Sequence, residues 1–355
     1  MRIGILTGGG DCPGLNAVIR AVVRKGVFHH QDEFTGFLEG WRGVMEDQTT
    51  ALSLDAIAGI LPRGGTILRT SRTNPMKKEG GIQRCLETLK RHRVEALISI
   101  GGDDTQSVAY KLHECGVKVV GVPKTIDNDL SGTDFCFGFD TAVNVATEAI
   151  DRVHTTAEAH NRVIVVEVMG RDSGWIAIYS GIAGGADVIL IPERPFDIDE
   201  VAETLRQRHN RGRYFSVVVV AEGARLIAGK DDQVAFAPGK KDEFDHIRLG
   251  GIGTLLAQEL EKRTGFETRA VVLGHTQRGG SPTAFDRMLA TRYGIGAIDA
   301  VHRSDFGKMV ALKGTQIVTI ALKEALSRTR VVGQDLIDVA IGLGEPMHAT
   351  ALKGK

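Results

Sequence analysis

The most constraining feature of the sequence is a regular alternation between short apolar runs and segments whose apolar residues recur every three to four positions. In the first third, the apolar runs at 3–7, 96–100 and 117–122 predict strands, and the segments at 14–25 and 105–115 predict helices. Strands that alternate with helices in this way pair in parallel. The order of these segments therefore predicts an α/β fold with a mainly parallel sheet.

A second series of the same kind follows a long helical pattern at 139–160. Its expected strands are 163–168, 188–191, 214–221 and 268–273. Its expected helices are 173–182, 198–209, 253–262 and 282–302. The polar segment 224–249 predicts a long loop or hairpin, and the tail from Met309 predicts two short strands and a helix at 334–342. At roughly 150 residues per domain, 355 residues predict two domains, and the restart places a boundary near Phe139.

Charge and cysteine content narrow the class of protein. The 44 Lys and Arg residues balance 44 Asp and Glu residues, whereas nucleic-acid and membrane-surface binders need a net basic field. The apolar stretch at the N-terminus is too short for a signal peptide, and Asp187 interrupts the longest apolar stretch, 175–192. Cys12, Cys85, Cys115 and Cys136 lack CxxC spacing and are expected as reduced thiols. We therefore expect a soluble, cytoplasmic protein.

Glycine and acidic residues follow three of the expected strands. These segments read GGGD at 8–11, GGDDT at 101–105 and PKTIDND at 123–129. Because parallel strands bring their carboxyl ends to one edge of a sheet, the three segments are expected to lie together. Ligands of open α/β sheets bind at such an edge.

Each of these segments also has a purely structural interpretation. The glycine run at 8–11 is typical of a tight connection as well as of an anion site at a helix N-terminus. It does not fit GxGxxG, because Pro13 stands where the third glycine would be, and the sequence contains no GxxxxGK[ST]. The acidic pair at 103–104 is also typical of a helix N-cap, and the segment 127–129 of an Asx-turn. The occurrence of all three at strand ends favours a functional site.

The chemistry that this combination favours is phosphoryl transfer. Mg²⁺ binds to one or two carboxylates together with phosphate oxygens and water, so Asp103 and Asp129 are candidate metal ligands. A further carboxylate, Asp127, would accept the proton of an attacking hydroxyl. Arg72 and Arg171 would bind the oxygens of the transferred group.

The motifs TGGGDCPGLNAVIR, GGDDT, PKTIDNDL, MGRDSGW, AEGA and GHTQRGGSP stand in the order found in the 6-phosphofructokinases, which this chain resembles over residues 1 to about 330. The resemblance implies two Rossmann-like three-layer α/β/α domains with mainly parallel sheets and an active site in the cleft between them. The larger, phosphate-donor-binding domain would comprise 1–138 and about 277–327. The smaller, fructose-6-phosphate-binding domain would comprise about 139–276 and 328–355.

The resemblance also implies roles for matching residues. Asp127 would deprotonate the sugar 1-hydroxyl beside Thr125 and Asp129, and Asp103 would associate with Mg²⁺. Gly10 and Arg72 would contact the phosphate donor, and Arg171 would steady the transferring group. The other contacts to the substrate would be Met169, Gly170, Glu222, His275 and Arg278. Arg162 and Arg269 would reach the 6-phosphate from a neighbouring subunit. Sites shared in this way imply a homodimer or homotetramer.

Two positions bear on the phosphoryl donor. The ATP-using members of the family carry glycine at the positions of Asp104 and Lys124, whereas the pyrophosphate-dependent members resemble this chain. Asp104 would repel the α-phosphate of a nucleotide, by about 4 kcal/mol at ~4 Å and an effective dielectric of about 20 before screening. Lys124 would attract the phosphates of pyrophosphate. An Asp104–Lys124 ion pair without a substrate role is the structural alternative. We therefore expect a reversible, pyrophosphate-dependent reaction in glycolysis and gluconeogenesis.

Other functions stay open at this point. They are an ATP-dependent 6-phosphofructokinase, a kinase of the NAD or lipid type that also carries GGD[DG]T, and a non-catalytic phosphosugar-binding subunit. Arg20 and Arg24 match two basic residues of the effector site of bacterial relatives, but His154 stands where an arginine is expected. We therefore expect no regulation by ADP or phosphoenolpyruvate.

Overall fold

The computed structural model describes residues 1–227 and 251–343, which form two compact units. Within the described residues, unit 1 comprises 1–141 and 278–329, and unit 2 comprises 142–227, 251–277 and 330–343. Along the described residues, the chain passes from unit 1 to unit 2 after Thr141, lies in unit 1 again from Arg278, and returns to unit 2 after Thr329. The loop or hairpin expected at 224–249 lies almost wholly outside the described residues.

Unit 1 contains a seven-stranded sheet in the order β11-β10-β5-β4-β1-β2-β3. Only the two edge strands, β3 and β11, pair antiparallel to their neighbours, so the mainly parallel sheet expected from the sequence is confirmed. The strands are β1 (Arg2–Thr7), β2 (Glu33–Phe37), β3 (Thr49–Ala51), β4 (Ala96–Gly101), β5 (Val119–Pro123), β10 (Lys308–Lys313) and β11 (Gln316–Ala321).

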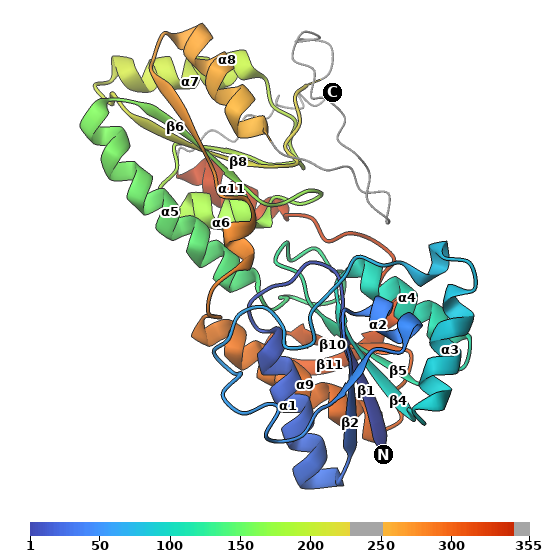
Figure 1. The fold of residues 1–355 in the computed structure, drawn as a ribbon. Coiled ribbons are helices and arrows are strands. Elements are labelled where there is room, and N and C mark those ends of the chain that lie inside the picture. Colours follow the sequence, from blue (N-terminus) through green and yellow to red (C-terminus); the bar gives the residue numbers. More distant parts are fainter. Residues whose placement is uncertain (228–250, 344–355) are drawn as a thin grey trace. The chain divides into compact units, whose positions relative to one another are not determined.

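Helices cover both faces of this sheet (Figure 1). The helices α1 (Leu15–Lys25) and α9 (Ala284–His302) pack together along one face. The other face is covered by α2 (Trp41–Glu46), α3 (Gly81–Arg91), α4 (Asp103–Glu114) and α10 (Leu322–Ala325), which share one apolar core with the strands. That core includes Trp41, Cys85, Leu112 and Leu322, all fully or almost fully buried.

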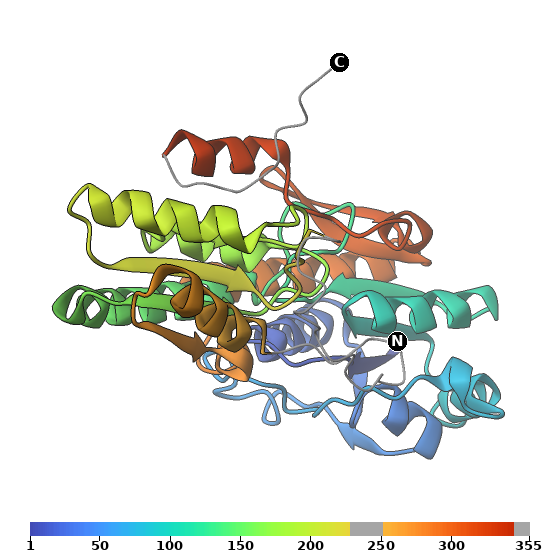
Figure 2. The same ribbon diagram turned by 90° about the horizontal axis from the view of Figure 1, so that it is seen from above.

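Unit 2 contains a four-stranded, wholly parallel sheet in the order β7-β8-β6-β9. Its strands are β6 (Val163–Val168), β7 (Val188–Leu190), β8 (Ser216–Ala221) and β9 (Thr268–Val272), and its helices are α5 (Phe139–His160), α6 (Trp175–Ala183), α7 (Ile198–Asn210), α8 (Ile252–Thr264) and α11 (Gln334–Gly342). Alternate strand residues pack against α7 and α8 in one core. The helix α5, drawn in green, runs beside these strands in both views (Figures 1 and 2).

The structure differs from the sequence expectation at several elements. The strands β2 and β3 and the helices α2, α3 and α10 were not expected. In addition, α4 begins at Asp103 rather than near Thr105, because Gly102 takes the N-cap position with extended backbone. Asp103 and Asp104 therefore lie in the first turn of a helix and are not N-cap residues.

No helix among residues 1–227 and 251–343 combines the length and the apolar character needed to cross a bilayer.

Candidate active site

The glycine turn after β1 is held by contacts with two neighbouring segments. The N–H of Gly8 donates to the carbonyl of Ile100 at the end of β4, and that of Gly9 donates to the carbonyl of Ser71. A Cβ at Gly8 would lie 2.6 Å from Thr105 Oγ1, so a side chain at this position would separate β1 from the start of α4. The helix α1 begins only at Leu15, so these glycine amides do not form a helix N-terminus, contrary to the sequence expectation.

Two cationic side chains lie at this turn. The ammonium of Lys124 donates to the Gly10 carbonyl, and Nη1 of Arg278 donates to the Asp11 carbonyl at 3.1 Å. Lys124 is only 3% exposed, and desolvation lowers the pKa of its ammonium, with Arg278 acting in the same direction. Because two buried or half-buried cations adjoin one turn, an anion bound there would relieve both their desolvation and their mutual repulsion.

Arg72 lies next in sequence to Ser71, the residue whose carbonyl binds the Gly9 amide, and its side chain is exposed. A second hydrogen bond joins the loop of Arg72 to the glycine turn, because the hydroxyl of Thr70 donates to the Gly9 carbonyl at 2.6 Å. The structure therefore brings Arg72 to the same turn as Lys124 and Arg278. These residues of unit 1 are the expected ligands of the donor phosphates, with the exception of Arg278, which the resemblance assigns to the sugar 6-phosphate.

The ends of β4 and β5 are fixed to each other by Gln106, which the sequence analysis did not single out. Its buried Nε2 lies 3.0 Å from the Ser99 carbonyl, 3.2 Å from the Gly101 carbonyl and 3.0 Å from the Val122 carbonyl. The contact joins the strand before Asp103 to the strand before Lys124. The available signal in the sequence was a glutamine close behind two acidic residues that follow an expected strand.

The segment after β5 carries the expected catalytic carboxylate. The hydroxyl of Thr125 accepts a hydrogen bond from the N–H of Asp127 at 3.0 Å. Asn128 has the left-handed φ of 52°, and its side-chain oxygen accepts from the distant N–H of Cys136 at 2.9 Å. The backbone around Asp127 is therefore positioned both by Thr125 and by Asn128.

The three acidic residues Asp103, Asp127 and Asp129 act on one another electrostatically. Desolvation raises the pKa of the half-buried Asp129 well above its usual range, and the negative charges of Asp127 and, more weakly, Asp103 raise it further. Asp103 itself is exposed at the first turn of α4, where the helix dipole favours an anion. A divalent cation would relieve this repulsion.

No group of three or more His, Cys, Asp or Glu side chains within 1–227 and 251–343 has an arrangement suited to a metal ion. A magnesium ion bound through two carboxylates would therefore take its remaining ligands from water and substrate phosphate, which is its usual preference. The exposure of Asp103 suits such a partly hydrated site. The residues present thus fit Mg²⁺ bound together with a phosphate donor.

The expected sugar contacts of unit 2 follow β6 and β8. The N–H of Glu222 donates to the Val168 carbonyl at 2.8 Å, which joins the two strand ends. Gly170 has a φ of 131°, a conformation that a residue with a side chain rarely adopts. The N–H of the buried Met169 donates to Oε1 of Gln277 at 3.3 Å, which links this turn to the 3₁₀ helix Gly274–Arg278 that carries the exposed His275.

Arg162 and Arg269 lie close together where the adjacent strands β6 and β9 begin. Arg162 immediately precedes β6, and Arg269 pairs with Ile164 in the register of the two strands. Both guanidinium groups contact the carboxylate of Glu267, at 2.9 Å for Arg162 and 2.6 Å for Arg269. The two arginines expected to share a role are therefore brought together, and Glu267 is a third member of the group that the sequence analysis missed.

Three of the arginines expected to bind phosphate share an unusual property. Among the described residues, the buried arginine Nε atoms without an acceptor are those of Arg162, Arg171 and Arg278. An unsatisfied buried donor is costly, by roughly 1–3 kcal/mol, and marks a place where a ligand acceptor would be favourable. This property agrees with an anion-binding role.

Arg20 and Arg24, which match basic residues of an effector site in the resemblance, lie on α1, and His154 lies on α5. The guanidinium of Arg24 lies over the ring of Phe28, 5.2 Å from its centroid, and Arg20 is half-buried on the same helix. His154 contacts Phe215 edge to face, with 5.2 Å between ring centroids.

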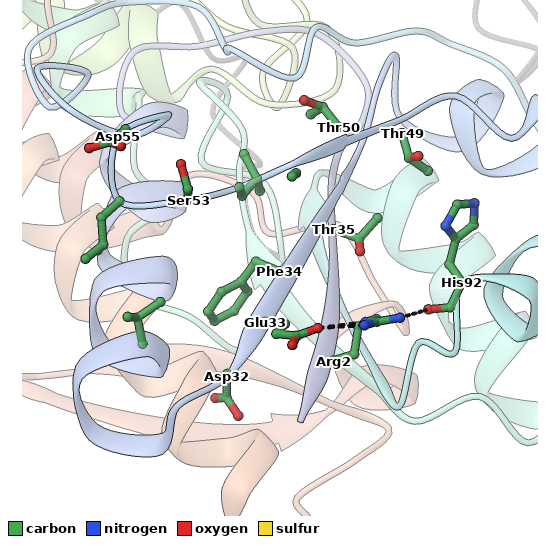
Figure 3. Close-up of a pocket in the computed structure, with 14 residues that line it drawn as sticks. Arg2, Asp32, Glu33, Phe34, Thr35, Thr49, Thr50, Ser53, Asp55 and His92 are labelled. Atoms are coloured by element: carbon green, nitrogen blue, oxygen red, sulfur yellow. Dashed lines mark hydrogen bonds and ion pairs between the residues drawn. The ribbon is translucent and has the colours of Figure 1, made fainter.

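A separate groove of about 760 Å³ runs along β2 and β3 (Figure 3). Arg2, Glu33, Thr50 and His92 are among the residues that line it, and Arg2 forms an ion pair with Glu33. Arg2 and Glu33 are the first residues of β1 and β2, whereas Gly10, Asp103 and Lys124 follow the last residues of β1, β4 and β5. The groove contains none of the expected site residues.

Comparisons with known proteins agree on one family. The model of the family described as Phosphofructokinase matches residues 2–301. A pyrophosphate–fructose 6-phosphate 1-phosphotransferase of Streptomyces coelicolor is 58% identical over 339 residues, which cover 95% of this chain and 98% of the relative. A protein of the same organism named ATP-dependent 6-phosphofructokinase 3 is 53% identical, with coverage of 94% and 96%. The structure of a pyrophosphate-dependent phosphofructokinase from Marinobacter aquaeolei shares the fold, with a TM-score of 0.80 at 23% identity and coverage of 94% and 86%.

Proposed function

The chain belongs to the phosphofructokinase family, and on that premise we propose that it reversibly transfers a phosphoryl group from pyrophosphate to the 1-hydroxyl of D-fructose 6-phosphate. The products are fructose 1,6-bisphosphate and phosphate. Relatives with 58% identity over nearly their whole length carry the name of this activity. The match of the family over residues 2–301 leaves a kinase of the NAD or lipid type without support.

The observation that carries the choice of donor is the placement of Lys124. Its buried ammonium lies on the Gly10 carbonyl, at the turn where the donor phosphates are expected. Pyrophosphate offers no base or ribose for recognition, so its affinity must come from contacts to its phosphates, and a desolvated cation supplies a strong one. Asp104, in the first turn of α4, adds a negative charge that a nucleotide α-phosphate would have to tolerate.

ATP is the alternative donor, because a relative named as ATP-dependent is nearly as similar, at 53% identity. Turnover of the purified chain with Mg-pyrophosphate and with Mg-ATP, measured by a coupled assay for fructose 1,6-bisphosphate, separates the two. We expect turnover with pyrophosphate. Activity with ATP alone would overturn the proposal, and the absence of turnover with either donor would favour a non-catalytic phosphosugar-binding subunit.

A pair of variants tests the physical reason for the choice of donor. If Asp104 and Lys124 exclude the nucleotide, Asp104→Gly combined with Lys124→Gly should raise kcat/KM for ATP and lower kcat/KM for pyrophosphate. Asp104→Gly alone separates the effect of charge repulsion from the effect of the lysine. If ATP use rises in neither variant, exclusion of the nucleotide by these side chains is wrong even where pyrophosphate is the donor.

The proposed proton transfer takes place at Asp127. Its carboxylate accepts the proton of the sugar 1-hydroxyl as that oxygen attacks the phosphorus of the donor, and the bond to the leaving phosphate breaks. Thr125 fixes the backbone of Asp127 through its hydroxyl. The neighbouring Asp129 makes a second ionised carboxylate at this position costly, which strengthens Asp127 as a proton acceptor in the forward reaction.

Magnesium completes the proposed site. Asp103 and Asp129 would hold it, and its charge would neutralise the phosphate oxygens during transfer. In this proposal Gly10, Arg72, Asp104 and Lys124 line the place of the donor, and Arg171 stabilises the transferring group. A cytoplasmic location stays a prediction.

The sugar phosphate would be bound by residues of unit 2. Met169, Gly170 and Glu222 would contact the sugar, and His275 and Arg278, the latter in unit 1, would contact its 6-phosphate. In the proposed homo-oligomer, Arg162 and Arg269 would bind the 6-phosphate held by a neighbouring subunit. Mixing a subunit that carries Asp127→Ser with one that carries Arg162→Ala tests this arrangement, because hybrid oligomers with shared sites should regain part of the activity that both variants lack.

A further inference from the structure

Glu267 connects the two arginines that are expected to bind the 6-phosphate. A single carboxylate oxygen, Oε1, lies 2.9 Å from Nη2 of Arg162 and 2.6 Å from Nη2 of Arg269. Nη1 of Arg269 donates in addition to the Thr268 carbonyl at 3.1 Å. One oxygen atom therefore sets the relative position of two guanidinium groups on adjacent strands.

The arrangement is electrostatically favourable because it separates two like charges. Two adjacent guanidinium groups repel each other, and a shared carboxylate offsets that repulsion and limits the rotamers that each side chain samples. The hydrogen bond from Arg162 lowers the pKa of Glu267, so the carboxylate is ionised near neutral pH. The contact also leaves donors of both guanidinium groups for a ligand, including the buried Nε of Arg162, which has no acceptor among the described residues.

We propose that Glu267 is a positioning residue that holds Arg162 and Arg269 as a pair of phosphate-binding groups. This inference rests on the proposed function, in which the two arginines bind the 6-phosphate of the sugar. Preorganised donors bind an anion more tightly, because the cost of ordering them has already been met in the free protein. The carboxylate thus strengthens phosphate binding although it carries the same sign of charge as the phosphate.

The sign of the effect distinguishes positioning from a simple field effect. By charge alone, removal of a carboxylate next to a phosphate site should tighten phosphate binding. By positioning, removal of the same carboxylate should weaken it. A structural role without relevance to the ligand should move neither the dissociation constant nor the KM for the sugar phosphate.

The experiment is calorimetric titration of fructose 6-phosphate, without donor, into the wild-type chain and into Glu267→Ala and Glu267→Gln. We expect the Kd to rise about tenfold in Glu267→Ala and about threefold in Glu267→Gln, whose amide oxygen still accepts hydrogen bonds but carries no charge. In turnover assays the KM for fructose 6-phosphate should rise by the same factors, while kcat stays within about twofold.

Glu261→Gln is the matched control, because Glu261 lies 3.7 Å from Arg269 and has no contact with Arg162 among the described residues. Its removal should leave the Kd unchanged or lower it slightly. A Tm of each variant close to that of the wild type shows that the fold is kept.

An unchanged or lowered Kd in both Glu267 variants would overturn the inference, and so would a wild-type chain that does not bind fructose 6-phosphate. If the wild type binds the sugar phosphate and the variants weaken it as expected, the inference holds even if no transfer from pyrophosphate is detected. In that case only the proposed function fails.

Discussion

The cations expected to bind phosphate are anchored differently in the two units. In unit 1, Lys124 and Arg278 donate to the consecutive backbone carbonyls of Gly10 and Asp11, and Lys124 is almost fully buried. In unit 2, Arg162 and Arg269 share a side-chain carboxylate, and their side chains are 30% and 56% exposed. A cation bound to a backbone carbonyl is held by a turn of the main chain, whereas an ion pair between two partly exposed side chains can adjust to its ligand.

This difference has an electrostatic consequence. Desolvation makes the charge of Lys124 costly, as its lowered pKa shows, so an anion at the glycine turn is attracted without much screening by water. In unit 2, Arg269 is 56% exposed and Arg162 is half-buried, so water and salt reach both guanidinium groups more easily than Lys124 and weaken each contact. We therefore expect the contact of Lys124 with the donor to be strong, and the contacts of Arg162 and Arg269 with the sugar phosphate to be individually weaker.

The largest expected effect concerns Asp127 in unit 1. Asp127→Ser removes the proton acceptor, and general-base catalysis contributes roughly 10²–10⁴-fold, so kcat should fall by about a thousandfold. The KM values should change only a few-fold, because the cations on both phosphates remain. Steady-state kinetics measures both quantities, with the exposed Asp151→Ser on α5 as a control of unchanged activity. A kcat near that of the wild type would remove Asp127 from the catalytic role.

The next effect tests the backbone-anchored cation directly. Lys124→Met keeps the length of the side chain and removes its charge, so the KM for Mg-pyrophosphate should rise about a hundredfold, the loss of one strong charge-assisted contact. The KM for fructose 6-phosphate should stay within a few-fold of the wild-type value. Lys90→Met, at an exposed position of α3, is the control. A rise confined to the KM for fructose 6-phosphate would show that Lys124 serves the sugar instead.

The buried carboxylate of Asp286 is held by neutral groups, with no ion pair to a cation among residues 1–227 and 251–343. This carboxylate accepts hydrogen bonds from the N–H of Thr141 at 2.8 Å and from its hydroxyl at 2.6 Å, which fixes the first turn of α5 to α9 within unit 1. Burial raises the pKa of Asp286 from 3.8 to about 6. The folded state therefore favours the protonated acid, so the stability that this group contributes is complete below pH 3.8 and is lost as the pH rises through 6.

Native-state hydrogen exchange at the Thr141 amide measures this loss. Between pH 4 and pH 7 its opening free energy should fall by about 2 kcal/mol relative to Asp286→Asn, which cannot ionise. Equal slopes in the two proteins would show that Asp286 stays ionised throughout and that its burial is offset by hydrogen bonds. In that case the N–H of Thr141 would stabilise the buried negative charge of Asp286, just as the Gly10 carbonyl stabilises the buried positive charge of Lys124.

The sequence predicted the parallel architecture because its strands are apolar and flanked by glycine or charged residues. The run 96–100 fits β4 to within one residue, and 163–168 fits β6. The strand β2 was missed because Thr35 and Gly36 interrupt its apolar pattern. The helix α3 was missed although Ile82, Cys85 and Leu89 have helical spacing, so the signal for that element was present.

The sequence predicted which residues belong to the site, but not the contacts that position their side chains. The positions of Asp103, Asp127 and Lys124 after strands followed from the order of apolar runs and from the resemblance. The contact of Lys124 with the Gly10 carbonyl joins positions 114 residues apart, and it depends on a rotamer that no local pattern encodes. Glu267 was missed for a similar reason, because its bond to Arg162 requires the register of β9 against β6.

The smallest expected effect is also the most direct test of the difference between the two units. Raising KCl from 0.05 to 0.5 M shortens the Debye length from about 14 to about 4 Å, so exposed charges lose most of their attraction for phosphate. The KM for fructose 6-phosphate should rise several-fold, while the KM for Mg-pyrophosphate, expressed as the concentration of the magnesium complex, should rise less because Lys124 is buried. If both values rise alike, the burial of Lys124 does not shield the donor contacts, and the two kinds of anchor are equivalent in binding.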